Sequence, residues 1–88
     1  MHWSRATANT GYCPQFDAVV GEFKCRQLLR LFARIRGVQS NELDRCADLV
    51  LQAVGLTMYS GRKVKALSGG CKRRLSLALA LIGWLARF

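Results

Sequence analysis

The chain has 88 residues, 51% of them hydrophobic and one of them proline. This length fits one small domain or a piece of a larger one, and the composition excludes an intrinsically disordered segment. Fourteen Lys and Arg residues against five Asp and Glu residues give a formal net charge of +9. Such a charge favours partners that carry phosphate groups, nucleic acid or an anionic membrane surface.

The four cysteines do not form a metal-binding pattern. No two are spaced as C-x-x-C and the sole histidine is His2, so a zinc site lacks its usual ligand pairs. With no secretory signal recognisable, we interpret the cysteines as reduced thiols of a cytosolic protein. The longest apolar run, residues 75–88, is interrupted by Ser76 and Arg87 and falls short of the roughly 20 residues that a transmembrane helix needs.

The N-terminal part of the chain lacks hydrophobic periodicity, and we expect residues 1–9 to be irregular. In the following stretch, "GYCPQFDA", Pro14 favours extended backbone at Cys13. The sequence therefore predicts a short extended segment followed by a loop over residues 15–17.

Residues 22–37 predict the first helix, because apolar side chains recur at i, i+3, i+4 and i+7. The predicted buried face consists of Leu28, Leu31, Phe32 and Ile35. The predicted opposite face carries Arg26, Arg30 and Arg34. Gly37 is a natural helix stop.

Residues 40–56 predict a second helix. Its buried stripe would consist of Leu43, Ala47, Val50, Leu51 and Val54. Ser40 or Asn41 could cap its start, and Gly55 would end it.

A third helix follows a basic connector, residues 57–66. Between Leu75 and Ile82 only Ser76 is polar, so this helix should be deeply buried on nearly all sides. Two short partner helices cannot readily cover that much apolar surface. We therefore expect an apolar face left uncovered in this chain.

The start of the third helix carries three cations, Lys72, Arg73 and Arg74. They lie at the positive end of the helix dipole, where each costs about 0.3–1 kcal/mol. Local rules broken in this way often mark functional sites.

Ser68, Gly69 and Gly70 stand directly before these cations. The free N–H groups of a first helical turn can hold a phosphate, and glycines let it approach the backbone closely. The alternative is that Ser68 only caps the helix and the glycines only make a tight turn. The cations, likewise, could either receive a phosphate or pair with acidic residues on neighbouring elements.

Three stretches resemble segments of ATP-binding cassette (ABC) proteins. The string "LSGGCKRRLSLALALIG" resembles the signature motif and the helix that follows it, and "GYCPQFDA" resembles the Q-loop in the form found in the A subfamily of ABC transporters. Between them, "LRLFARIRGV" resembles that subfamily's first helix after the Q-loop. The order is that of the family, and the resemblance covers about residues 10–83.

The resemblance implies a mostly α fold. It would be the helical subdomain of an ABC cassette, with three helices preceded by a short strand and the Q-loop, as an incomplete α/β P-loop NTPase fold. Residues 10–83 would form a partial nucleotide-binding domain, between the irregular residues 1–9 and a truncated tail over residues 84–88.

The resemblance also implies roles for individual residues. In the family the signature motif contacts the γ-phosphate of ATP held by the partner domain of a head-to-tail dimer, a role that falls here to Ser68, Gly69 and Gly70. The Q-loop glutamine, here Gln15, contacts Mg²⁺ and the attacking water. The implied cofactors are ATP and Mg²⁺. The implied partners are a second nucleotide-binding domain and the transmembrane domains of the transporter, with no nucleic acid.

The implied activity is ATP-driven transport, largely of lipids, from the cytoplasmic face of a membrane. The sequence departs from the family at several points, because it contains no G-x-x-x-x-G-K-[ST] string, no aspartate–glutamate pair after an apolar strand and no switch histidine. We therefore expect a fragment that does not hydrolyse ATP by itself and that, when isolated, is either soluble and cytoplasmic or unstable. Cys71 stands where the signature commonly has glutamine, and Lys24 where the family usually has threonine.

Two further functions are compatible with the sequence. The chain could be an interaction module that offers its signature motif to an intact cassette. It could also be a small basic protein that binds an anionic membrane through the arginine-bearing face of its first helix.

Overall fold

The computed structural model of the chain describes residues 14–85. Four α-helices and three short 3-10 helices follow one another: α2 (Pro14–Glu22), α3 (Cys25–Ile35), η1 (Ser40–Glu42), α4 (Leu43–Ala53), η2 (Thr57–Tyr59), η3 (Val64–Ala66) and α5 (Gly69–Leu85). Across this range the only strand-like pairing is an isolated bridge between Lys24 and Lys63. The expected mostly α fold class is confirmed.

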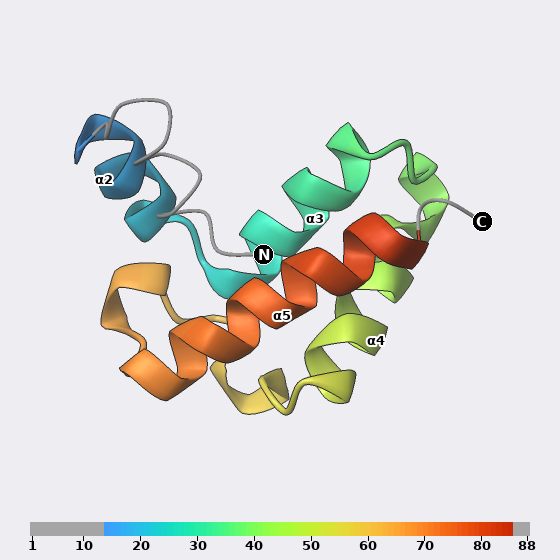
Figure 1. Ribbon diagram of the computed structural model, residues 1–88. Helices are drawn as coiled ribbons and strands as arrows, with labels where there is room; N and C mark the ends of the chain where they lie inside the picture. Colours follow the sequence, from blue (N-terminus) through green and yellow to red (C-terminus); the bar gives the residue numbers. More distant parts are fainter. Residues whose placement is uncertain (1–13, 86–88) are drawn as a thin grey trace.

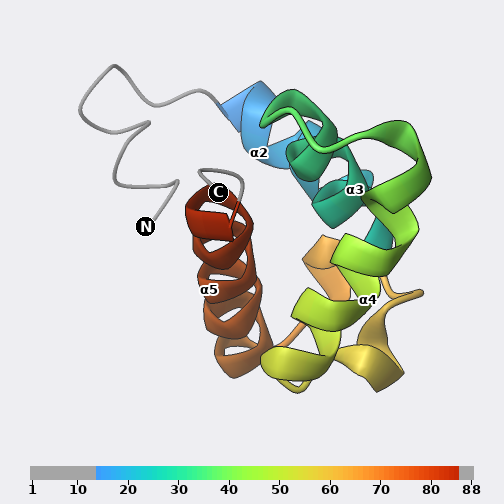
Figure 2. The ribbon, with the colours of Figure 1, turned by 90° about the vertical axis from the view of Figure 1, so that its right-hand side faces the viewer.

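The three helices α3, α4 and α5 form the body of the molecule and pack against one another. α5, the longest helix, runs between α3 and α4 in the view of Figure 1, and in Figure 2 it stands as a separate layer beside them. α2 lies outside this bundle and packs on η3, the turn that precedes α5.

One hydrophobic core joins the bundle. It contains Cys25, Leu28, Leu29, Ala33, Leu43, Ala47, Val50, Leu51, Val54, Leu56, Val64, Leu67, Leu75, Ala78, Leu79 and Ile82. No polar or charged side chain is buried among the residues for which burial is described. All five residues of the stripe predicted for α4 belong to this core, so that prediction is confirmed.

The buried face of α3 differs from the predicted one. Its buried residues are Cys25, Leu28, Leu29 and Ala33. Of the predicted face, Leu28 is buried and Phe32 is partly buried against the core, whereas Leu31 is 40% exposed and Ile35 is 70% exposed. Because α3 packs against both α4 and α5, its buried stripe is shifted toward Leu29 and Ala33 and away from Leu31 and Ile35.

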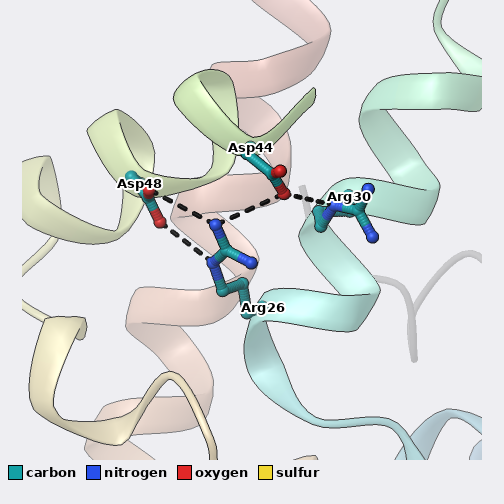
Figure 3. Close-up of polar contacts among 4 residues, drawn as sticks. All are labelled: Arg26, Arg30, Asp44 and Asp48. Atoms are coloured by element: carbon teal, nitrogen blue, oxygen red, sulfur yellow. Dashed lines mark hydrogen bonds and ion pairs between the residues drawn. The ribbon is translucent and has the colours of Figure 1, made fainter. Parts of the chain in front are cut away.

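The predicted arginine face of α3 pairs with α4 (Figure 3). Arg26 donates two hydrogen bonds to Asp48, at 3.0 and 3.3 Å, and its Nη2 lies 3.3 Å from Asp44 Oδ1. Arg30 Nε lies 2.8 Å from the same Asp44 oxygen. The hydrogen bond from Arg26 lowers the pKa of Asp48. These pairs link α3 to α4, and because they are solvent-exposed they add little to stability.

The predicted helix stops are confirmed, but the predicted cap is wrong. Gly37 has φ +100° and Gly55 has φ +75°, a left-handed conformation that glycine adopts without a Cβ penalty. Ser40 and Asn41 do not cap α4, because the chain forms η1 there and the N-cap position falls on Glu42, which makes no side-chain capping hydrogen bond.

The loop predicted over residues 15–17 is wrong, because these residues lie inside α2. Pro14 occupies the first position of that helix, where its fixed φ and missing N–H carry no cost. Glu22, at the end of α2, receives hydrogen bonds from Lys63 and Lys65. The predicted extended segment before Pro14 and the predicted irregular N-terminus lie outside the described residues.

α5 is buried on one side only. Leu75, Ala78, Leu79 and Ile82 face the core, whereas Leu77 is 58% exposed and Leu85 is 42% exposed. The prediction of burial on nearly all sides is therefore wrong, and the expectation of an uncovered apolar face is confirmed. Within residues 14–85, no helix combines the length and hydropathy needed to cross a membrane.

Candidate functional site

The site begins at the junction between η3 and α5. Ser68 caps α5, since its Oγ accepts a hydrogen bond from the N–H of Cys71 at 3.2 Å and its carbonyl accepts one from Lys72 N–H at 2.9 Å. Gly69 and Gly70 form the first positions of the helix, and both are exposed. A Cβ added to either glycine would meet nothing within 4 Å. The structure thus brings the three residues together around an open helix N-terminus.

The cations that follow have different surroundings. A Cβ added to Gly55, just past the end of α4, would lie 3.4 Å from Arg74 Nη1. Arg74 therefore reaches the C-terminal end of α4, where the helix dipole favours a positive charge. Neither Lys72 nor Arg73 has an ion pair within the described part of the chain, and no acidic residue lies in the first turn of α5. Two cations thus remain exposed beside the glycines.

Cys71, the departure at the fifth signature position, is half-buried and packs against the core. It is a free thiol, as is the fully buried Cys25 at the start of α3. Burial raises the pKa of Cys25, and the neighbouring Cys71 adds a smaller contribution in the same direction. The side chain at this position thus belongs to the packing between α3 and α5 rather than to the open surface at the glycines.

The connector between α4 and α5 is tied to the first turn of α3. The N–H groups of Cys25 and Arg26 donate to the carbonyls of Arg62 and Ser60, at 2.9 and 3.0 Å. These bonds satisfy donors that the start of a helix otherwise leaves unpaired. They also hold the connector, and hence the start of α5, against the bundle, a role that the sequence pattern did not reveal.

Gln15 lies in α2 rather than in a loop, and its side chain lies outside what the structure describes. α2 packs on η3, which ends two residues before Ser68. The helix is anchored there by Glu22, whose Oε1 lies 2.9 Å from Lys63 Nζ. Hydrogen bonds from Lys65 and Lys63 lower the Glu22 pKa to about 2. The sequence analysis did not predict this contact of Glu22 with Lys63 and Lys65. The one signal for it in the sequence is that Glu22 is an acidic residue in a strongly basic chain.

The residues at the start of α5 fit a phosphate group. The glycines leave the helix N-terminus open, Lys72 and Arg73 are exposed beside it, and the Ser68 hydroxyl keeps its own hydrogen while its oxygen accepts the capping bond. The site offers no ligand set for a metal ion, because no group of three or more His, Cys, Asp or Glu side chains forms among the described residues. The site is thus suited to an anion.

A bundle whose longest helix opens on a capped Ser-Gly-Gly sequence is the arrangement expected for the signature end of an ABC helical subdomain. No protein-family model matches the chain, and no solved structure matches it. Curated proteins do match.

The retinal-specific phospholipid-transporting ATPase ABCA4 of Mus musculus is 48% identical to the chain over 75 residues, which are 85% of the chain and 3% of the relative. ABCA4 of Bos taurus is 48% identical over 73 residues, 83% of the chain and 3% of the relative. The phospholipid-transporting ATPase ABCA3 of Rattus norvegicus is 42% identical over 73 residues, 83% of the chain and 4% of the relative. Over most of its own length the chain is thus homologous to one segment of A-subfamily ABC transporters, and it spans only 3 to 4% of the length of these relatives.

Proposed function

We propose that this chain is the part of a nucleotide-binding domain that runs from the Q-loop to the signature motif, and that it presents Ser68, Gly69 and Gly70 to the γ-phosphate of an ATP molecule held by a partner domain. The observation that carries the proposal is the open, capped start of α5 beside Lys72 and Arg73. Backbone N–H groups and fixed positive charges stabilise the charge that spreads over the phosphoryl oxygens during transfer.

Gln15 has the second role in this proposal, as the contact to Mg²⁺ and to the attacking water. Its support is the A-subfamily form of the surrounding string and the packing of α2 on the turn before Ser68. When bound, ATP and Mg²⁺ supply the transferable phosphoryl group and the charge that neutralises it. The chain's own residues would bind and orient that group.

We assign any transport activity to a larger protein that contains such a segment, and not to the 88-residue chain. The relatives' names describe phospholipid-transporting ATPases, and we infer a phospholipid cargo, transmembrane domains as partners and a position at the cytoplasmic face of the membrane. We also infer that the 88-residue chain does not hydrolyse ATP alone, because its sequence has no P-loop string to hold the β- and γ-phosphates.

The test is binding of the chain to an intact A-subfamily nucleotide-binding domain, measured with and without a non-hydrolysable ATP analogue. We expect binding that requires the nucleotide and that G70D abolishes by placing a carboxylate against the γ-phosphate. The matched control is G61D, because Gly61 is also exposed, has no positive φ and has nothing within 4 Å of an added Cβ. Aspartate is favourable near a helix N-terminus, so G70D should not unfold the chain.

Two results would refute the proposal. If G70D and G61D bind equally well, the glycines do not face the nucleotide. If binding is independent of the nucleotide, Ser68, Gly69 and Gly70 do not contact ATP and the chain binds its partner through another surface. The uncovered apolar face of α5, which includes the exposed Leu77, is such a surface.

A further inference from the structure

A second site lies on α3 and at the start of α4, apart from the start of α5. A cavity of about 170 Å³ is lined there by Gln27, Arg30, Leu31, Arg34 and Leu43. The first four residues recur along one face of α3 at spacings of three and four, so their side chains are neighbours. The proposed nucleotide contact uses none of them.

The polar groups of this cavity are hydrogen-bond donors. Gln27 Oε1 already accepts a hydrogen bond from the N–H of Lys24 at 3.0 Å, which leaves the two N–H groups of its amide. A guanidinium only donates, so Arg30 and Arg34 offer no acceptor. No carboxylate lines the cavity. A concave surface with donors alone is complementary to an anion.

The charge of the cavity is only partly neutralised. Arg30 approaches Asp44 through Nε, 2.8 Å from Oδ1, and Figure 3 shows its two terminal nitrogens pointing away from that carboxylate. Asp44 is shared, because Arg26 Nη2 lies 3.3 Å from the same oxygen. The Nε of Arg30 is buried and, despite its short distance from Asp44 Oδ1, makes no hydrogen bond of good geometry within residues 18–85. Arg34 has no ion pair within that same range, so one positive charge or more remains available.

We propose that this cavity binds a phosphate group, held by the terminal nitrogens of Arg30, by Arg34 and by the amide of Gln27. Arginine suits phosphate because its planar fork can donate two parallel hydrogen bonds to two oxygens. The volume is smaller than the about 300–1,000 Å³ of typical sites for whole organic ligands, so the cavity takes a single phosphate group rather than a nucleotide. Leu31 and Leu43 provide the apolar wall. The group comes either from a soluble phosphate compound or from a lipid headgroup.

The experiment is a titration of the full ¹⁵N-labelled chain followed by NMR. One arm adds inorganic phosphate, and the other adds phosphatidylcholine vesicles with or without phosphatidic acid. We expect saturable changes at the Gln27 side-chain amide and at Arg34 Nε–H. A response to inorganic phosphate identifies a site open to soluble phosphate, and a response only to vesicles with phosphatidic acid identifies a lipid headgroup site. No response in either arm overturns the proposal.

Three variants make the test specific. R34Q should weaken binding about tenfold, the effect of losing one exposed charge-assisted contact, while R45Q, which removes an exposed arginine of α4 outside the cavity, should not. Q27E keeps the oxygen that accepts from Lys24 and replaces the donors by a negative oxygen, so it should abolish binding without disturbing α3.

Two results of the variant series would overturn the proposal. Equal weakening by R34Q and R45Q would mean attraction by net charge alone. Changes confined to the backbone amides of Gly69 and Gly70 would also overturn it, because the phosphate would then occupy the start of α5. That last result would leave the proposed nucleotide contact intact, so the two proposals fail separately.

Discussion

The buried face of α3 can be tested by truncating two aliphatic side chains of the same helix. L29A and I35A each delete three carbon atoms, but Leu29 is fully buried and Ile35 is 70% exposed. At about 0.8 kcal/mol for each buried methylene, the lost transfer free energy is about 2.4 kcal/mol at Leu29 and about 0.7 kcal/mol at Ile35. The cavity left at Leu29 raises its total to about 3 kcal/mol or more, and alanine's better helix propensity offsets a few tenths at Ile35.

The assay is urea unfolding followed by circular dichroism, with the free energy of unfolding taken from the midpoint and slope. We expect L29A to lower this free energy by at least 2 kcal/mol more than I35A does. The hydrophobic pattern of the sequence alone predicts the opposite order, since it assigns Ile35 to the buried face. Equal losses, or a larger loss for I35A, would refute the packing of α3 described here.

Three other changes have defined outcomes. G55A forces a β-carbon onto a residue with φ +75° and should lower the free energy of unfolding by about 1–2 kcal/mol. G61A, at an open position without positive φ, should not, and equal effects in urea melts would contradict the role given to the left-handed turn. The Glu22 pKa, about 2, is lower than its value of 4.5 in the unfolded chain, so the unfolded state binds the extra proton and stability falls as the pH drops from about 4.5 toward 2. E22Q should remove that part of the pH dependence of the urea midpoint, and an unchanged profile would show that Glu22 does not anchor α2. S68A should lower the free energy of unfolding by about 1 kcal/mol through loss of the α5 cap, and a loss below about 0.3 kcal/mol in the same melts would argue against the cap.

The sequence predicted helix ends where a single residue type decides the conformation. Gly37 and Gly55 both end helices with positive φ, a conformation that depends on the absence of a Cβ and not on the rest of the fold. The stripe of α4 was predictable because Leu43, Ala47, Val50, Leu51 and Val54 recur at spacings of three and four and so share one face of the helix.

The face of α3 could not be predicted in the same way. Its apolar residues form adjacent pairs, Leu28 with Leu29 and Leu31 with Phe32, and such pairs allow two overlapping faces. The choice between them depends on where α4 and α5 lie, which is tertiary information. α2 was missed although Pro14 at its first position is a recognised helix-start signal, because the same proline also favours extended backbone before it.

The residues of the candidate site were found from a local string, and their spatial relations were not. The string indicated Ser68, Gly69 and Gly70, but nothing in it placed Arg74 beside Gly55 at the end of α4. The cavity on α3 was equally hidden, since it depends on Leu43 from α4 lying next to Arg30 and Arg34. A motif of consecutive residues can be recognised in a sequence, whereas contacts between residues of different helices can be predicted only once the fold is known.

The cap at Ser68 gives one hydroxyl two simultaneous uses. Its oxygen accepts from the N–H of Cys71, while its hydrogen stays available to an incoming acceptor. An aspartate at this position would cap the helix equally well and would repel a phosphate. S68D should therefore leave folding unchanged while removing the proposed nucleotide contact, whereas S68A should weaken both. Several residue types at position 68 can thus cap α5 and keep it folded. If function requires serine at this position and does not tolerate aspartate, an anion binds at this turn.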